Sequence, residues 1–359
     1  MITKKQLVFP AFNALIGIFW GAAIGYYVYS ILGGVIVGAL TGFVIGVLIE
    51  ALAVHLGSEH WLYRRRVLLT TVLEIPLALL TLGPFVYLLA SVQASPHSIR
   101  CEPPTAFGAA NSTTVEIGTE DGIMLSGWYV PPQSTQPGPV LVLLHGAKGD
   151  RCQMTWHAQH LLAAGYGVLM MDTRATGEST GDQTAMGWRE GEDMLALLDF
   201  LTARPEVDAA RIGVVGSSAG AHMALNGAYL APGRMAALWL DGLGPQRMAD
   251  FPEPENFQEK FVTAINARVL RLAEWYFREP APPAYVDILA GLDEPQIMLV
   301  TGELEAFEHN VNLKYAAAAG ENVGLWVVEG GYHCSGPVTS PEAYAQNMLA
   351  FFERTLGEE

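Results

Sequence analysis

The sequence predicts an α/β protein with a doubly wound, mostly parallel sheet, preceded by a membrane-spanning region. Two observations carry this prediction. After residue 112, short β-branched runs alternate with helix-compatible stretches, the pattern of a parallel sheet covered by helices. Before residue 95, by contrast, the chain is almost continuously apolar. The 359 residues therefore divide into two units of different kinds.

The first 94 residues contain three apolar runs, at about 7–29, 31–54 and 67–92. Each run is long enough to cross a bilayer as a helix, which takes about 20 residues. Glycines recur at every fourth position from Gly17 and again from Gly34. That spacing places them on one helix face, so we expect the backbones of the first two helices to pack closely.

Basic residues predict the orientation of these spans. Lys4 and Lys5 precede the first run and three arginines occupy 64–66, whereas the turn between the first two runs has no charge. Because basic loops stay on the cytoplasmic side, three crossings place the remainder of the chain outside the cytoplasm. We therefore expect a multi-pass protein of the cell membrane with an extracytoplasmic C-terminal domain.

A proline-containing linker is predicted at 95–112, followed by one domain over 113–359. The 36 acidic residues outnumber the 20 basic ones, and the excess falls in this domain, which argues against a nucleic-acid partner. Cys101, Cys152 and Cys334 lack a metal-ligand spacing, so no metal is expected. Two of them can form a disulfide, and the sequence does not choose which.

The elements of the domain follow a regular order. An antiparallel hairpin is predicted at 113–119 and 123–130. The later strands are expected at 139–144, 167–171, 211–215, 235–240, 296–301 and 323–328, and the helices at 152–164, 188–203, 221–230, 308–319 and 341–355. Residues 242–290 form an insertion, with helical spacing of apolar residues over 257–277, which we interpret as a small helical lid or cap.

The stretch Gly216-Ser217-Ser218-Ala219-Gly220 ends a buried strand and leads into a helix, as in a nucleophile elbow. Such a turn strains its middle residue and leaves no room for side chains at the flanking positions, which explains the glycines. Ser218 is thus the predicted nucleophile. A serine needs a neighbouring base, and His333, in a glycine-bracketed loop after the last strand, is the best candidate.

From about residue 113 to its end, the chain resembles the α/β-hydrolase superfamily, and most of all its membrane-anchored bacterial serine hydrolases with esterase-like relatives. The matching stretches are 120–132, 145–150, 172–179, 216–220 and 330–333. The resemblance implies a Ser-acid-His triad. Family members usually carry Asp after the strand at 296–301, whereas this chain has Glu305 there. We predict Glu305 as the acid, with Glu303 and Asp241 as alternatives.

The oxyanion of a tetrahedral intermediate needs backbone N–H donors, and we predict those of Ala147 and Ala219. His145 is expected to shape the loop that carries Ala147. Asp172 and Arg174 are expected to hold an adjacent loop through charge-assisted hydrogen bonds. The histidines within helical stretches, such as His157 and His222, are interpreted as packing residues.

These features predict a membrane-anchored serine hydrolase that cleaves carboxylic ester or thioester bonds through an acyl-enzyme. The expected partner is a small-molecule or lipid-like acyl substrate, and no cofactor is implied. Two alternatives remain open. One is a peptidase or amidase that uses the same triad, and the other is a non-catalytic membrane scaffold.

Overall fold

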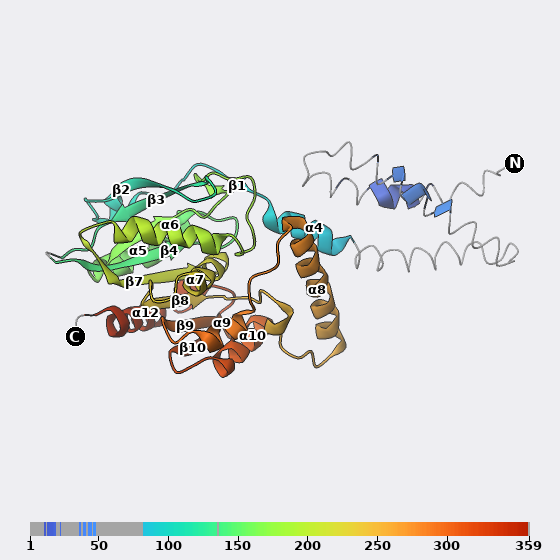
Figure 1. Cartoon of the computed structure of the whole chain (residues 1–359). Helices are drawn as coiled ribbons and strands as arrows, with labels where there is room; N and C mark the ends of the chain where they lie inside the picture. Colours follow the sequence, from blue (N-terminus) through green and yellow to red (C-terminus); the bar gives the residue numbers. More distant parts are fainter. Residues whose placement is uncertain are drawn as a thin grey trace, which may run out of the picture. The chain divides into compact units, whose positions relative to one another are not determined.

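The computed structural model describes residues 82–134 and 136–357, together with residues 11, 13–18, 22, 36, 39, 40, 42–44, 46 and 47 (Figure 1). The chain divides into two compact units. One comprises Met1–Gln93 and Asn256–Tyr276, and the other comprises Ala94–Glu255 and Phe277–Glu359.

The second unit is built on an eight-stranded sheet with the strand order β10-β9-β8-β7-β4-β5-β3-β2. The pairs β2–β3 and β3–β5 are antiparallel, and the other pairs are parallel. The strands are β2 (Thr113–Gly118), β3 (Met124–Val130), β4 (Gly138–Leu144), β5 (Gly167–Met171), β7 (Val207–Ser217), β8 (Ala237–Asp241), β9 (Gln296–Gly302) and β10 (Val323–Val328). The predicted mostly parallel sheet, led by an antiparallel hairpin, is confirmed.

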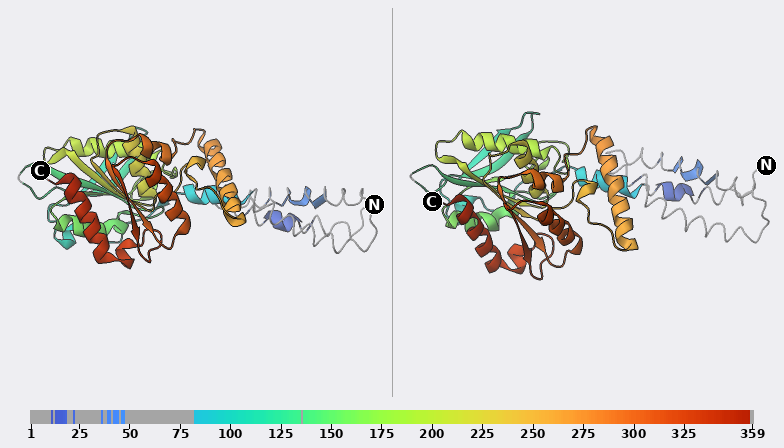
Figure 2. Two further views of the ribbon diagram at one scale, coloured as in Figure 1. Left: turned by 90° about the horizontal axis from the view of Figure 1, so that it is seen from below. Right: turned by 60° about the horizontal axis from the view of Figure 1, so that its bottom comes forward.

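Helices cover both faces of this sheet (Figure 2). They are α5 (Thr155–Ala163), α6 (Glu190–Thr202), α7 (Ala219–Leu230), α9 (Tyr285–Gly291), α10 (Ala306–Ala318), α11 (Gly336–Thr339) and α12 (Pro341–Leu356). Alternate residues of β4 point to opposite faces, so Val142 joins one apolar core with α6, α7, α9 and α10. Leu143 joins the other core, with α5 and α12. The doubly wound arrangement follows from this two-sided burial.

The predicted linker is part of the second unit. Its first residues form β1 (Ser95–Pro96), which pairs in parallel with β6 (Thr176–Gly177). A short 3-10 helix, η2 (Pro104–Phe107), follows, and Cys101 forms a disulfide with Cys152. The free thiol among the described residues is that of Cys334. The sequence of 95–112 has the composition of a linker. It is nevertheless ordered by strand pairing and a disulfide with distant residues, and such contacts leave no local sequence pattern.

The predicted insertion between β8 and β9 divides into segments with different environments. It contains η4 (Met248–Asp250), α8 (Phe257–Phe277) and α9. Helix α8 matches the predicted helical range, and nearly all of it belongs to the first unit. Helix α9 instead packs into the sheet's core, where Tyr285 is fully buried. A lid over Ser218 formed by α8 stays a prediction.

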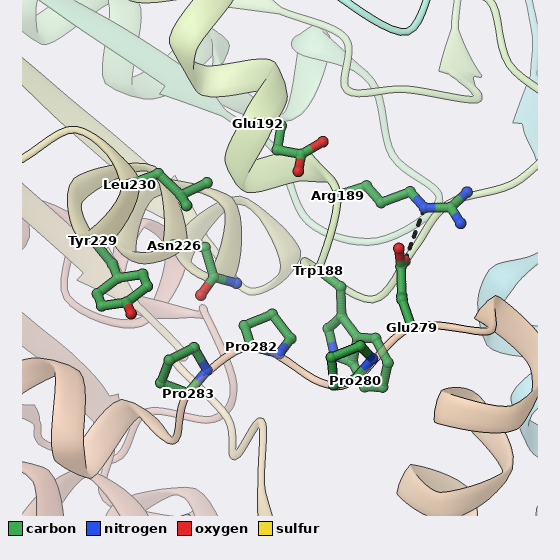
Figure 3. A pocket seen from close by; sticks show the side chains of 10 residues that line it. All are labelled: Trp188, Arg189, Glu192, Asn226, Tyr229, Leu230, Glu279, Pro280, Pro282 and Pro283. Atoms are coloured by element: carbon green, nitrogen blue, oxygen red, sulfur yellow. Dashed lines mark hydrogen bonds and ion pairs between the residues drawn. The ribbon is translucent and has the colours of Figure 1, made fainter.

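The segment after α8 is rich in proline and lines a cavity beside α7 (Figure 3). The cavity measures about 270 Å³, and Pro280, Pro282 and Pro283 form one wall. Asn226 lies in the opposite wall, and an ion pair between Arg189 and Glu279, at 2.9 Å, closes one end.

In the first unit, the predicted spans lie almost wholly outside the described residues. The helix α4 (Gly83–Val92) forms the end of the third predicted span. Within the part of the chain that the structure describes, no helix combines the length and apolar character that crossing a bilayer requires. A Cβ atom at Gly42 would lie 2.1 Å from the carbonyl oxygen of Asn13. The close backbone approach expected from the glycine spacing is therefore confirmed at this position.

The disulfide predicts a measurable loss of stability when it is removed. It joins cysteines 51 residues apart, and closing a loop of that length restricts the unfolded chain. We expect the Cys101→Ala/Cys152→Ala variant to lose about 2–4 kcal/mol of unfolding free energy. Thermal unfolding of the full chain in detergent, followed by circular dichroism, measures the change in Tm. Wild type treated with a reductant should have the same Tm as the variant. If both had the Tm of the oxidised wild type, the prediction would be wrong.

Candidate active site

Ser218 occupies the strained turn that its sequence predicted. It lies between the end of β7 and the start of α7, with φ 51° and ψ −111°. Non-glycine residues rarely adopt such backbone angles, and strain of this kind is typical of functional sites. A Cβ at Gly216 would lie 2.6 Å from the carbonyl oxygen of Gly220, and one at Gly220 would lie 2.2 Å from that of Leu144. The steric reason for both glycines is therefore confirmed.

His333 lies beside this serine. Its Nε2 is 2.9 Å from the Oγ of Ser218, a hydrogen-bond distance. The histidine follows β10 in a loop that packs tightly on its neighbours, because a Cβ at Gly302 would lie 2.5 Å from the carbonyl oxygen of Gly331. A Cβ at Gly242 would lie 2.7 Å from the imidazole Cε1. Glycines on two adjoining loops thus leave the space that the His333 ring occupies.

The carboxylate that contacts His333 belongs to Glu308. The prediction that Glu305 is the acid of the triad is therefore wrong. An oxygen of Glu308 forms a short hydrogen bond with the Nδ1 of His333. The other oxygen accepts a hydrogen bond of 3.0 Å from the hydroxyl of Thr301. The Glu308 side chain is 11 % exposed. Glu308 lies in the first turn of α10, whereas Glu305 precedes that helix.

The two alternative acids have other partners. Glu303 accepts a hydrogen bond of 2.8 Å from the backbone amide of Gly330. Asp241 is buried at the end of β8 and accepts one of 2.7 Å from the hydroxyl of Tyr344. Burial raises the pKa of Asp241 to about 7. Neither carboxylate forms a hydrogen bond with His333 among the described residues.

One sequence signal pointed to Glu308. It shares a helix face with the fully buried residues Val311, Asn312 and Tyr315. A charged side chain on the inward face of a helix is costly unless it has a partner. Glu308 is the one carboxylate on that face of α10. Its position on the inward face of the helix therefore identified it better than the number of residues that separate it from the end of β9.

Hydrogen bonding to Glu308 raises the pKa of His333 above its ordinary value, and the charges of Asp241 and Glu305 raise it further. Burial of the ring acts in the opposite direction but is outweighed. The pKa rises because the nearby carboxylate stabilises the positively charged imidazolium form of His333. His333 is therefore a stronger base than an isolated histidine.

The two predicted oxyanion donors belong to segments that adjoin the serine. Ala147 lies in a turn closed by a hydrogen bond of 3.1 Å from the amide of Gly149 to the carbonyl of Gly146. A Cβ at Gly146 would lie 3.5 Å from the Cβ of Ser218, so this turn adjoins the nucleophile. Ala219 is the first residue of α7, where an amide has no partner within the helix. Among the described residues, no acceptor takes a hydrogen bond from either alanine amide.

His145 shapes this turn, as predicted. It is fully buried, its Nε2 accepts a hydrogen bond of 3.1 Å from the amide of Thr173, and its Nδ1 lies 2.7 Å from the carbonyl oxygen of Gly146. Because Nε2 accepts, Nδ1 carries the proton and donates. Burial lowers the pKa of His145, as it lowers that of His157 to about 3 and that of His222 to about 4. These three histidines are neutral and structural.

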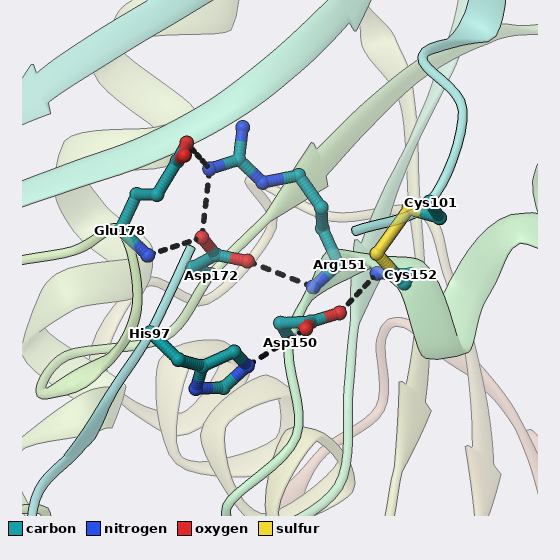
Figure 4. The surroundings of a disulfide bond; sticks show 7 residues. All are labelled: His97, Cys101, Asp150, Arg151, Cys152, Asp172 and Glu178. Atoms are coloured by element: carbon teal, nitrogen blue, oxygen red, sulfur yellow. Dashed lines mark hydrogen bonds and ion pairs between the residues drawn. A yellow bond between two sulfur atoms is a disulfide. The ribbon is translucent and has the colours of Figure 1, made fainter. Parts of the chain in front are cut away.

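Asp172 and Arg174 stabilise neighbouring loops through charge-assisted hydrogen bonds, as expected, and Figure 4 shows the partners of Asp172. Asp172 forms an ion pair of 2.7 Å with Arg151, both side chains being fully buried, and also accepts a hydrogen bond from the Arg151 amide. Arg174 pairs with Asp193 at 2.5 Å. His145 and Arg151 therefore anchor both ends of the loop that carries Ala147. The proline-lined cavity contains none of the predicted site residues.

Comparison with known proteins bears on the fold of the domain. A sequence profile of the X-Pro dipeptidyl-peptidase (S15) family matches residues 121–248. An uncharacterized protein of Mycobacterium tuberculosis is 35 % identical over 118 residues, which are 33 % of this chain and 41 % of that protein. The chain thus matches about two fifths of that relative's length.

Two longer matches cover most of the domain. The alpha/beta hydrolase domain-containing protein WAV2 of Arabidopsis thaliana is 26 % identical over 255 residues, which are 68 % of this chain and 79 % of that protein. An esterase of Pyrococcus furiosus superposes with a TM-score of 0.56 and 24 % identity, over 74 % of this chain and 98 % of the esterase. The sheet order, the strained serine and these matches together identify the chain as a member of the α/β-hydrolase superfamily.

Proposed function

We propose that this protein is a serine hydrolase that cleaves carboxylic ester or thioester bonds through an acyl-enzyme. One observation carries the proposal. The Oγ of Ser218 lies 2.9 Å from the Nε2 of His333, whose Nδ1 contacts the buried carboxylate of Glu308. A nucleophile, a base and a group that orients the base are the components that acyl transfer requires.

Each group has a distinct part in the reaction. As Ser218 attacks the substrate carbonyl, His333 accepts its proton, and Glu308 holds Nδ1–H and stabilises the imidazolium. The amides of Ala147 and Ala219 stabilise the oxyanion of the tetrahedral intermediate. Collapse of the intermediate breaks the carbonyl–oxygen or carbonyl–sulfur bond, and His333 gives its proton to the leaving alcohol or thiol. A water molecule, deprotonated by His333, then attacks the acyl-enzyme and releases the acid.

A peptidase that uses the same triad is the second candidate. The profile match to X-Pro dipeptidyl-peptidases favours it, although the matched range 121–248 includes Ser218 and ends before Glu308 and His333. The match therefore reflects the first part of the domain and the elbow rather than the whole triad. Comparing p-nitrophenyl esters with X-Pro p-nitroanilides separates the two, because only a peptidase hydrolyses the anilides efficiently.

We place the catalytic domain outside the cytoplasm, tethered by the predicted spans at 7–29, 31–54 and 67–92. Two observations support this location. The runs are long and apolar, with basic residues in the flanking positions that face the cytoplasm. In addition, the domain carries the Cys101–Cys152 disulfide, and disulfides persist mainly in oxidising compartments. A lipid-like acyl substrate fits such a tether.

The proposed nucleophile and base predict selective labelling by a fluorophosphonate probe. Wild type should react at Ser218, whereas Ser218→Ala and His333→Ala should not. Their kcat on a p-nitrophenyl ester should fall by at least about 10⁴-fold, because triad members act as a unit. Gel fluorescence of the full-length protein in membranes reports the labelling. A folded wild type that neither labels nor turns over would favour the scaffold alternative.

Glu308 and Glu305 provide a matched pair of variants. We expect Glu308→Gln to reduce kcat/KM by on the order of 10²–10⁴-fold, because an amide neither fixes the required tautomer nor stabilises the imidazolium. Glu305→Gln removes a carboxylate that makes no hydrogen bond to His333 and should change kcat/KM by less than about threefold. Steady-state ester hydrolysis measures both. Equal losses, or a larger loss at Glu305, would refute the assignment.

The pH profile should report the interaction between Glu308 and His333. The histidine acts as a base only when neutral, so kcat/KM falls as the pH drops through its pKa. Because Glu308 raises that pKa, the acid limb of wild type should lie above the ordinary histidine value, and Glu308→Gln should move it to lower pH. Profiles of kcat/KM against pH for both proteins measure the shift. An acid limb that stays in place would show that Glu308 does not act on His333.

A further inference from the structure

One face of α8 is exposed along its whole length. Its members recur at intervals of four, three, four, three and four residues, which places them on one side of a helix. We call this the cationic-aromatic face of α8, and it consists of Phe257, Phe261, Ala264, Arg268, Arg271 and Trp275. All six are exposed, with Phe257 at 83 % and Trp275 at 68 %.

The opposite side of the same helix is packed in its C-terminal part. Val269, Ala273 and Phe277 are 3 %, 0 % and 6 % exposed. Helix α8 and helix α4 belong to the same compact unit (Figure 1). Val262, on the same side but nearer the start of the helix, is 39 % exposed, so the exposure is one-sided only in the C-terminal part. The cationic-aromatic face leaves large aromatic rings in contact with water. Exposed apolar surface of this kind indicates an interaction site.

The charge of this face differs from that of the remaining chain. The full sequence has a formal net charge of −16, yet the cationic-aromatic face carries two arginines and no acidic residue. Lys260, one turn from Phe257, adds a third cation at its edge. In the described part of the chain, no carboxylate pairs with Lys260, Arg268 or Arg271, and Arg268 donates only to the carbonyl of Ala264, at 3.0 Å.

The cationic-aromatic face has aromatic rings at both ends and cations between them, a pattern typical of helices that bind a bilayer surface. Tryptophan and phenylalanine settle at the level of the lipid head groups, and basic side chains attract anionic lipids. A second feature favours lipid over a protein partner. The unit that contains α8 also contains the three long apolar runs, and α4, in the same unit, ends the third of them.

We infer that α8 lies on the surface of the membrane that anchors the chain, with its cationic-aromatic face bound to anionic phospholipid. Phe257, Phe261 and Trp275 enter the head-group region, and Arg268 and Arg271 contact lipid phosphates. The inference rests on the proposed membrane tether and is independent of the chemistry at Ser218. It assigns a second membrane contact, besides the tether, to a protein whose net negative charge disfavours binding to anionic lipid.

A fluorescent label on this face tests the inference. Ala264→Cys, carrying an environment-sensitive nitrobenzoxadiazole label, is reconstituted as full-length protein into vesicles of phosphatidylcholine alone or mixed equally with phosphatidylglycerol. Val338→Cys, on the 85 % exposed position of α11, is the matched control, and the unaltered chain reports any labelling of Cys334. Circular dichroism checks that each variant is folded.

We expect the emission of the label at 264 to shift to the blue in the anionic vesicles, and much less in phosphatidylcholine. The label at 338 should not respond. Arg268→Gln/Arg271→Gln, or high salt, should remove the difference between the two lipids.

Three outcomes would overturn the inference. No shift at 264 in protein that floats with the vesicles would reject the contact and leave the tether intact. An equal shift in both lipids, unaffected by the arginine substitutions, would show that this face does not bind anionic lipid selectively. Protein that fails to float with either vesicle would reject the tether and the contact together.

Discussion

The active-site arrangement depends on a steric constraint at the turn after β7. The backbone there passes so close to its neighbours that a Cβ at Gly220 would lie 2.2 Å from the Leu144 carbonyl oxygen. The same turn is held by a hydrogen bond of 2.7 Å from the Ser218 amide to the Asp241 carbonyl. Strands β4, β7 and β8 therefore meet at one point, with the serine held in a strained conformation above it. A rigid parallel sheet is what maintains that strain.

Electrostatic differences then separate one histidine from the others. His145, His157 and His222 are held neutral by burial, so they act as packing and hydrogen-bonding groups. His333 alone among these four has a carboxylate on its Nδ1 and a hydroxyl on its Nε2. Its raised pKa follows from that carboxylate. His97 also pairs with a carboxylate, that of Asp150, so the combination of a carboxylate on one ring nitrogen and the Ser218 hydroxyl on the other is what sets His333 apart.

The loop from His145 to Arg151 connects the chemistry to the rigid part of the fold. His145 anchors one end through Thr173, and Arg151 anchors the other through the buried carboxylate of Asp172. The next residue, Cys152, is joined by the disulfide to the chain that precedes the sheet. Donors that stabilise an oxyanion are effective only if they need not reorganise, and these long-range contacts supply that rigidity.

The sequence by itself determined the parts of the protein that depend on local pattern. Alternating apolar runs identified the strands, and the glycines of the elbow identified Ser218, because sterics at a sharp turn act on adjacent residues. The loop position of His333 was also evident. Only the tertiary structure decided that Glu308, rather than Glu305, reaches His333, because the phase of α10 sets which side chain points inward. It also decided the Cys101–Cys152 pairing and the partner of Asp172. Those contacts join residues far apart in the chain, and the sequence pattern around a residue shows at most that it faces inward, not which distant residue it meets.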